Sequence, residues 1–242
     1  MRRYLEPLAA HPALAPHLRF GAQVSAIDRH GLDKMSSEGR ADTPFEIRWR
    51  DPDGAEHRSL AWAVIDASGT WTQPNPMGAD GPPVPSEEEA AADIAYGIPD
   101  LSGTEREAYS GRRVLVVGSG HSAINVVLDL LRLQEAAPAT GVTWALRRNR
   151  MEKLLGGGLY DALPARGALG LAATQAIAAG RLDVLAPFAA ERIVRGATGL
   201  DVCGRLGTEP WTGTVDRIVV ATGFRPDLAL LREVRIALDP AV

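Results

Sequence analysis

The sequence has a single cysteine, no excess of positive charge and no long apolar run. The lone Cys203 excludes an internal disulfide and a CxxC redox pair. No uninterrupted apolar run approaches the roughly 20 residues that a membrane-spanning helix needs. Near the start, Glu6, Pro7 and His11 interrupt any stretch that could serve as a signal peptide. These absences predict a cytoplasmic protein without a membrane partner.

The charge balance and the histidines exclude two further classes of partner. The 26 Lys and Arg residues against 30 Asp and Glu residues give a formal net charge of -4, which provides no general electrostatic reason to bind nucleic acid. The five histidines do not cluster with cysteine or carboxylates at ligand spacing, so no metal site is predicted. The 242 residues suffice for one large or two modest globular domains, and an oligomer is possible.

Short apolar or alternating runs in the first third of the sequence predict antiparallel strands. They cover residues 20–30, 45–50 and 57–69, with polar turn segments between them. The last run is expected to end as a buried strand over 63–67. The stretch that follows, residues 73–90, is dense in proline and glycine, and we interpret it as an ordered connector rather than a free linker.

The second half of the sequence alternates strand and helix patterns. Residues 112–147 predict strand, helix and strand, and the helix carries one apolar stripe that faces a sheet. A second helix is expected before Gly180, which is typical of a helix end. The further strands are predicted at 182–185, 188–194, 198–206 and 216–223.

The turn GSGHSA, between the first of these strands and its helix, is typical of a pyrophosphate site. The first turn of a helix offers free backbone N–H groups and the positive end of the helix dipole. Gly118 permits the sharp turn, Gly120 permits close approach of a phosphate, and Ala123 permits tight packing of helix on strand. Ser122 would either donate to a phosphate or cap the helix. The predicted contacts are Gly118, Ser119, Gly120, His121, Ser122 and Ala123.

Arginines follow the second strand of this unit, where dinucleotide folds usually place a carboxylate for the ribose 2′-hydroxyl. The run WALRRNR supplies Arg147, Arg148 and Arg150. Two charge-assisted bonds to a 2′-phosphate would contribute about 2–4 kcal/mol, or roughly 30- to 1,000-fold in preference. The alternative interpretation is an exposed basic loop. The pattern favours NADPH over NADH.

Two segments on either side of this module resemble one another. VIDASGTWTQP (64–74) and IVVATGFRP (218–226) each read as a buried strand followed by a small residue, a glycine, an aromatic residue and a proline. Either alone is compatible with an ordinary exit from a strand. As a pair around GSGHSA they are more specific, because such turns let the backbone approach a ligand.

On these motifs the chain resembles the two-dinucleotide flavoproteins, which include flavin-containing monooxygenases and thioredoxin-reductase-like enzymes. The resemblance implies an α/β fold with a Rossmann-like NAD(P)-binding domain inserted in a partial FAD-domain β-meander. The implied domains are a partial FAD-type domain (1–110), an NADPH-binding domain (111–220) and a truncated return crossing (221–242). It also implies FAD and NADPH as cofactors, and hydride transfer between them. The two crossings would be formed by Ala67, Ser68 and Gly69 and by Ala221, Thr222 and Gly223.

Several features of those families are missing. There is no upstream FAD-binding GxGxxG, no closing GD segment, and the stretch LSGTEREAY has Leu101 and Glu107 where the monooxygenase fingerprint has Phe and His. We therefore prefer a broad label, an NAD(P)H-dependent flavoprotein oxidoreductase with monooxygenase chemistry as one form, and expect the chain to be the central part of a longer protein. The alternative is a non-catalytic NADP(H)-binding module or inactive remnant. An S-adenosylmethionine-dependent methyltransferase is disfavoured by the arginines.

The sequence identifies neither the small-molecule substrate nor a catalytic residue. His121, inside the turn, is interpreted as a nucleotide contact or helix-start residue rather than a base, and Asp66 and Arg225 as structural or solvated charges. Cys203 is interpreted as a small buried hydrophobe rather than a nucleophile. The run GGG at 156–158 fits either a flexible loop near the nicotinamide or a plain surface loop.

Overall fold

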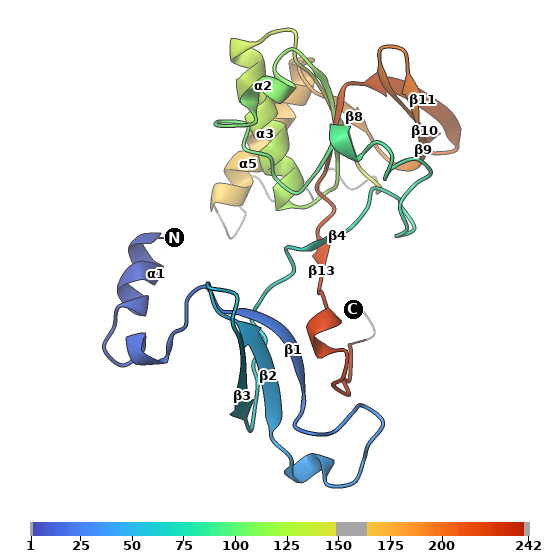
Figure 1. Cartoon of the computed structure of the whole chain (residues 1–242). Coiled ribbons are helices and arrows are strands. Elements are labelled where there is room, and N and C mark those ends of the chain that lie inside the picture. Colours follow the sequence, from blue (N-terminus) through green and yellow to red (C-terminus); the bar gives the residue numbers. More distant parts are fainter. Residues whose placement is uncertain (1, 149–163, 240–242) are drawn as a thin grey trace. The chain divides into compact units, whose positions relative to one another are not determined.

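The computed structural model describes residues 2–148 and 164–239 (Figure 1). Arg150 and the run at 156–158 lie outside the described residues. The chain divides into two compact units, one formed by residues 1–70 with 226–242 and the other by 71–225. These boundaries differ from those expected from the motifs, because the connector after residue 70 packs into the second unit.

The first unit is built on a three-stranded antiparallel sheet in the order β1-β2-β3, as predicted. On β2 the residues Phe45, Ile47 and Trp49 share one face, and the charged residues between them share the other. The strands are β1 (Gln23–Arg29), β2 (Phe45–Arg50) and β3 (Glu56–Ala61). The helical elements are α1 (Arg2–Ala9), η1 (Ala15–His17), η2 (Arg40–Asp42) and η5 (Ala229–Leu231), and the sequence analysis did not predict α1.

A charge network occupies the polar face of this sheet. Glu46 is buried and lies 2.7 Å from His30 Nδ1 and 3.1 Å from Arg48 Nε. The hydrogen bond with His30 is the main reason that the pKa of Glu46 lies below its usual value, although burial opposes it. Arg48 also pairs with Asp28 at 3.0 Å. The buried carboxylate is thus stabilised by a histidine just after β1 and by an arginine on β2.

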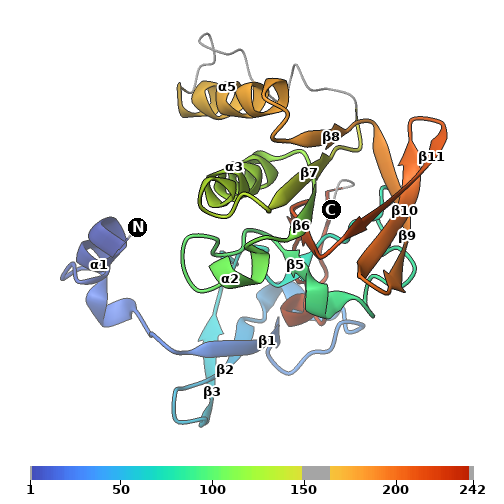
Figure 2. The same ribbon diagram turned by 90° about the horizontal axis from the view of Figure 1, so that it is seen from above.

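The second unit contains a five-stranded parallel sheet in the order β5-β12-β6-β7-β8. Helices α3 and α5 lie on one side of it, and a three-stranded antiparallel sheet lies on the other (Figure 2). The parallel strands are β5 (Ile94–Tyr96), β6 (Arg113–Val117), β7 (Gly141–Ala145), β8 (Asp183–Leu185) and β12 (Arg217–Val220). The antiparallel strands are β9 (Phe188–Gly196), β10 (Gly199–Leu206) and β11 (Glu209–Val215). The helical elements are α2 (Arg106–Tyr109), α3 (His121–Ala136), α5 (Pro164–Ala178) and η3 (Ala91–Asp93).

The central strand β6 is buried on both faces, which explains its unbroken apolar sequence. Val114 and Val116 belong to the core under α3, whereas Leu115 and Val117 belong to the core under β9–β11. The predicted strand-helix-strand is confirmed, as are α5 before Gly180 and strands β8, β9, β10 and β12. The sequence analysis did not find β5, β11 or α2.

The proline-rich connector is ordered, as expected. Glu87 is fully buried, and its carboxylate accepts the amide N–H groups of Met77 and Val84, each at 2.9 Å, and the hydroxyl of Tyr96 at 2.9 Å. Burial and the bond to this carboxylate raise the pKa of Tyr96. One buried side chain therefore holds two points of the connector and the end of β5 together.

The expectation of a buried strand over 63–67 was wrong. Strand β3 ends at Ala61, and residues 62–69 form no strand and are exposed, with Ile65 at 92% exposure. Strand conformation needs ladder partners, and no described residue pairs with this segment. The apolar residues of this segment favour burial, but among the described residues the segment is exposed.

Candidate nucleotide-binding site

The glycine turn begins where β6 leaves the sheet. Gly118 is buried and has φ +136°, a conformation that side chains rarely adopt. A Cβ at this position would lie 2.4 Å from the carbonyl oxygen of Ala221. The Gly118 amide donates to the Ala145 carbonyl at 3.1 Å, so the turn is fixed on both sides. Glycine is required here for conformation and for space.

Helix α3 begins at His121, with Gly120 as its N-cap and no side chain capping it. Ser122 therefore does not cap the helix, and its contact with a phosphate stays a prediction. A Cβ on Gly120 would meet nothing within 4 Å, so the space in front of the helix start is open. Ala123 is fully buried and packs in the core between helix and sheet. This geometry leaves backbone N–H groups facing open space.

Trp144 supports the turn from within the core, and the sequence analysis missed it. Its indole Nε1 donates to the Gly118 carbonyl oxygen at 2.8 Å. A tryptophan in a buried strand must find an acceptor for its N–H group, which is the signal that could have pointed to this role. The acceptor itself follows only from the three-dimensional register, since Trp144 lies beside Val116 of β6.

Arg147 and Arg148 follow β7 after the buried Leu146, and both side chains are exposed. They lie at the carboxyl edge of the sheet, on the strand next to β6, where a dinucleotide fold places its ribose-binding residue. Arg147 donates from Nη1 to the carbonyl of Ala79, 2.9 Å away. This bond ties the connector to the end of β7, while Arg148 is exposed beside it.

Asn75 joins the second crossing to the connector by hydrogen bonds, and its role was not predicted from the sequence. The Asn75 amide donates to the Gly223 carbonyl at 2.9 Å, and its side-chain Nδ2 donates to the Thr222 carbonyl at 3.2 Å. The Thr222 hydroxyl donates back to the Asn75 carbonyl at 2.9 Å. Arg225 Nε donates to Asn75 Oδ1 at 2.8 Å, which gives this arginine a structural role.

Beside Asn75 the chain forms a short ribbon, in which β4 (Gln73–Pro74) pairs antiparallel with β13 (Phe224–Arg225). Figure 1 shows the two strands side by side. Ala221 is buried against the glycine turn. The structure thus brings Ala221 and Thr222 next to Gly118, and Gly223 follows them as a partner of Asn75.

The first crossing is described within the other unit alone. Ser68 and Gly69 are exposed, and Gly69 has φ +80°. The Ser68 amide donates to Asp66 Oδ1 at 2.9 Å, and hydrogen bonds from Ser68 hold the pKa of Asp66 below its usual value. The Asp66 carboxylate therefore accepts hydrogen bonds within a local turn.

A family model for L-lysine 6-monooxygenase/L-ornithine 5-monooxygenase matches residues 2–156, more than half of the chain. The chain belongs to this family. The membership confirms the resemblance to two-dinucleotide flavoproteins inferred from the motifs. A search of curated proteins found no match.

Solved structures share the fold of this family member. A bacillithiol disulfide reductase from Bacillus cereus superposes with a TM-score of 0.67 at 17% identity, over 98% of this chain and 60% of that one. An L-lysine 6-monooxygenase from Pseudomonas syringae gives 0.59 at 19% identity, over 95% and 64%. An ornithine N-hydroxylase from Kutzneria sp. 744, in complex with reduced FAD, NADP+ and L-ornithine, gives 0.57 at 17% identity, over 88% and 56%. The chain thus spans only part of the length of these proteins.

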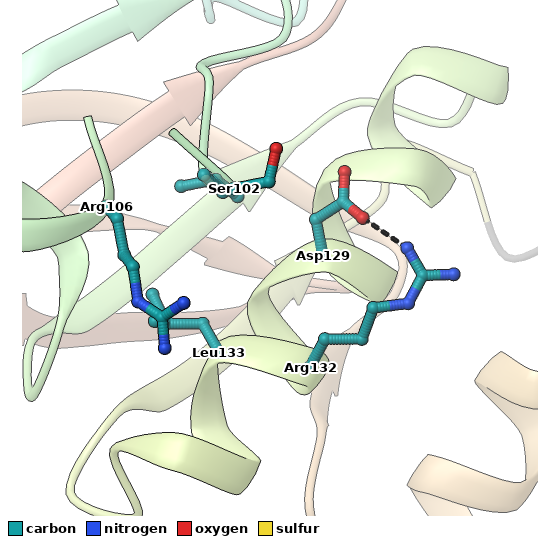
Figure 3. A pocket seen from close by; sticks show the side chains of 6 residues that line it. Ser102, Arg106, Asp129, Arg132 and Leu133 are labelled. Carbon is teal, nitrogen blue, oxygen red and sulfur yellow. Dashed lines mark hydrogen bonds and ion pairs between the residues drawn. The ribbon is translucent and has the colours of Figure 1, made fainter. Parts of the chain in front are cut away.

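A pocket of about 150 Å³ lies between α3 and the segment that contains Ser102 and Arg106 (Figure 3). It is lined by Leu101, Ser102, Arg106, Asp129, Arg132 and Leu133. Asp129 is eight residues beyond the start of α3 at His121, which at 1.5 Å per residue separates the two by about 12 Å. Asp129 and Arg132 pair with each other at 2.5 Å. The pocket is distinct from the glycine turn.

The other residues considered from the sequence have ordinary surroundings. His121 is exposed at the start of α3, and Cys203 is half-buried on β10. Among the described residues, no group of His, Cys, Asp and Glu could hold a metal ion. Over the same residues, no helix is long and apolar enough to cross a membrane.

Proposed function

We propose that the chain supplies the NADPH-binding part of a flavin-dependent monooxygenase that acts on the side-chain amine of lysine or ornithine. The observation that carries the proposal is the Gly118–Ala123 turn, with an uncapped helix start, open space at Gly120 and two exposed arginines on the next strand. Family membership supports the reaction class. A cytoplasmic protein with no nucleic-acid or membrane partner is part of this proposal, and a homo-oligomer is compatible with it.

The residues of the turn fit a dinucleotide. The pyrophosphate would lie against the backbone of Ser119 and Gly120 at the start of α3, where the helix dipole and free N–H groups stabilise negative charge. Ser122 and His121 would contact it from the first helical turn. The exposed Arg148, with Arg147 beside it, would bind the 2′-phosphate. Ala221 to Gly223 would shape the opposite wall of the turn.

When bound, NADPH supplies a hydride and FAD accepts it. The chain's own part is to hold and orient the nucleotide and to discriminate NADPH from NADH. The described residues contain one strand, glycine turn and helix of the required kind, which is β6 and α3. They do not form a second one for the FAD pyrophosphate, and contact of Ser68 and Gly69 with a cofactor stays a prediction.

Calorimetric titration with NADPH and with NADH tests the nucleotide part. We expect NADPH to bind roughly 30- to 1,000-fold more tightly, and Arg147→Ala/Arg148→Ala to reduce its affinity towards that of NADH. Arg192→Ala/Arg205→Ala, which removes the same charge from the antiparallel sheet, should leave the preference intact. Failure of the folded wild type to bind either nucleotide would overturn the proposal.

The second candidate is a non-catalytic NADP(H)-binding module. The single strand-turn-helix of the described residues favours it. An absorbance scan of the purified chain, alone and after addition of FAD, separates the two. A flavin spectrum with bleaching on addition of NADPH supports the oxidoreductase. Tight NADPH binding without retained flavin supports the module.

A further inference from the structure

Trp144 has the largest fully buried side chain among the described residues. It is the fourth residue of β7 and belongs to the core cluster that also contains Ala123 of α3. The only polar atom of its side chain donates to the carbonyl oxygen of Gly118 at 2.8 Å. Because a buried N–H without an acceptor is costly, the bond fixes both partners.

The Gly118 carbonyl is the first one beyond the regular ladder of β6 and β7, which ends at the pair Val117 and Ala145. In a planar trans peptide the C=O and N–H groups point in opposite directions. The carbonyl of Gly118 points into the core at Trp144, so the N–H of Ser119 points away from the core. Ser119 is exposed, and its amide has no acceptor among the described residues.

We infer that Trp144 is a positioning residue that holds the peptide between Gly118 and Ser119 in the one orientation that offers the Ser119 N–H to the nucleotide pyrophosphate. The inference rests on the proposed function. With the peptide reversed, a carbonyl oxygen would face the phosphates and repel them. In the observed orientation the amide joins the free N–H groups at the start of α3 in one anion-binding concavity.

The inference predicts which ligands are affected. The pyrophosphate is common to NADPH and NADH, whereas the 2′-phosphate is found only in NADPH. Loss of the Trp144 bond should therefore weaken both dinucleotides by the same factor. Loss of Arg147 and Arg148 should weaken NADPH alone. Adenosine 2′-monophosphate has the 2′-phosphate without the pyrophosphate, so it should depend on the arginines and not on Trp144.

The test uses Trp144→Phe and the replacement of Trp144 by 3-benzothienylalanine, which keeps the shape of the indole but has sulfur in place of N–H. Calorimetry measures NADPH, NADH and adenosine 2′-monophosphate, and thermal melting confirms folding. We expect both variants to weaken the two dinucleotides by about 10- to 100-fold, with their ratio unchanged. Binding of the monophosphate should change less than about twofold. Trp211→Phe, a half-buried tryptophan edge-on to Phe188 at 5.2 Å, is the matched control and should change nothing.

Each outcome decides a separate point. If the wild type binds neither dinucleotide, the proposed function fails. If the wild type binds and both Trp144 variants bind equally well, the positioning role is overturned while the proposed function stands. Equal weakening of all three ligands would also overturn it, because it indicates a general loss of structure. Should Trp144→Phe not fold, the sulfur analogue decides, since it preserves the packing.

Discussion

The two crossing segments have nearly the same sequence pattern and opposite surroundings. In VIDASG the side chain of Ile65 is 92% exposed, whereas in IVVATG the corresponding Val219 is completely buried. The second segment contains β12, which pairs with β5 on one side and β6 on the other. The first has only local bonds, from the amide and the side chain of Ser68 to Asp66. An apolar strand pattern therefore indicates that a segment favours burial. Whether the segment is buried depends on the presence of neighbouring strands.

The difference extends to ligand binding. The second crossing is held by Asn75 and packs against the glycine turn, so its backbone helps to fix the candidate site. In the first crossing Val64 and Ile65 are exposed, as is Trp62 just before it.

The largest expected effect comes from placing a charge in each crossing. Val219→Asp buries a carboxylate in the core under α3, and we expect a loss of about 4–5 kcal/mol in unfolding free energy, or failure to fold. Ile65→Asp should change stability by less than about 0.5 kcal/mol. Urea unfolding of the two variants checks this. Similar losses in both would mean that the first crossing is buried in solution, which would remove the contrast.

Next in size is the contact between the second crossing and the turn. Gly118→Ala forces a Cβ to within 2.4 Å of the Ala221 carbonyl oxygen at φ +136°, so we expect a loss on the order of 3 kcal/mol and no nucleotide binding. Gly120→Ala is the matched control, because its φ of -88° suits alanine and its Cβ meets nothing within 4 Å. It should keep its stability to within about 0.5 kcal/mol but weaken nucleotide binding tenfold or more, since the methyl group occupies the phosphate space. Unimpaired binding to Gly120→Ala would place the phosphates elsewhere.

The part of the site formed by residues that are close together in the sequence could be predicted. Gly118, Gly120 and Ala123 fall at fixed spacing, and the strand pattern before them and the helix pattern after them make that spacing specific. Trp144 and Asn75 could not be predicted, because their partners lie far along the chain and are chosen by sheet order and by the path of the connector.

The strand expected over 63–67 failed for a related reason. Periodicity measures how apolar a segment is, but ladder partners are a property of the whole fold. The short strand β5 was missed because three residues carry too little pattern to recognise. Helix α1 includes Pro7, which argues against a helix from sequence alone.

A smaller effect on stability is expected from removing the Asn75 side chain, which is hydrogen-bonded to the second crossing. Asn75→Ala removes the bonds from Nδ2 to the Thr222 carbonyl and from Arg225 to Oδ1, and we expect a loss of about 1–2 kcal/mol because the position is only half-buried. Gln73→Ala, on the exposed side of the same ribbon, should cost less than about 0.5 kcal/mol. Urea unfolding measures both. Equal stability of the two variants would show that the backbone pairing of β4 and β13 holds the crossing by itself.

The smallest expected effect concerns the local bonds between Ser68 and Asp66 in the first crossing. Hydrogen bonds from Ser68 lower the pKa of Asp66, so the ionised carboxylate stabilises the turn above the pKa of the unfolded chain, near 3.8, and this contribution is lost as the pH falls through the lower folded value. Because the group is almost fully exposed, the change in stability should be close to the limit of detection. An NMR titration of the Asp66 carboxyl carbon should show a midpoint below 3.8, which Ser68→Ala shifts up only in part, since the backbone amide still donates. A midpoint at the ordinary value would mean that even this turn is not formed, and that the first crossing has no order of its own, in contrast to β12.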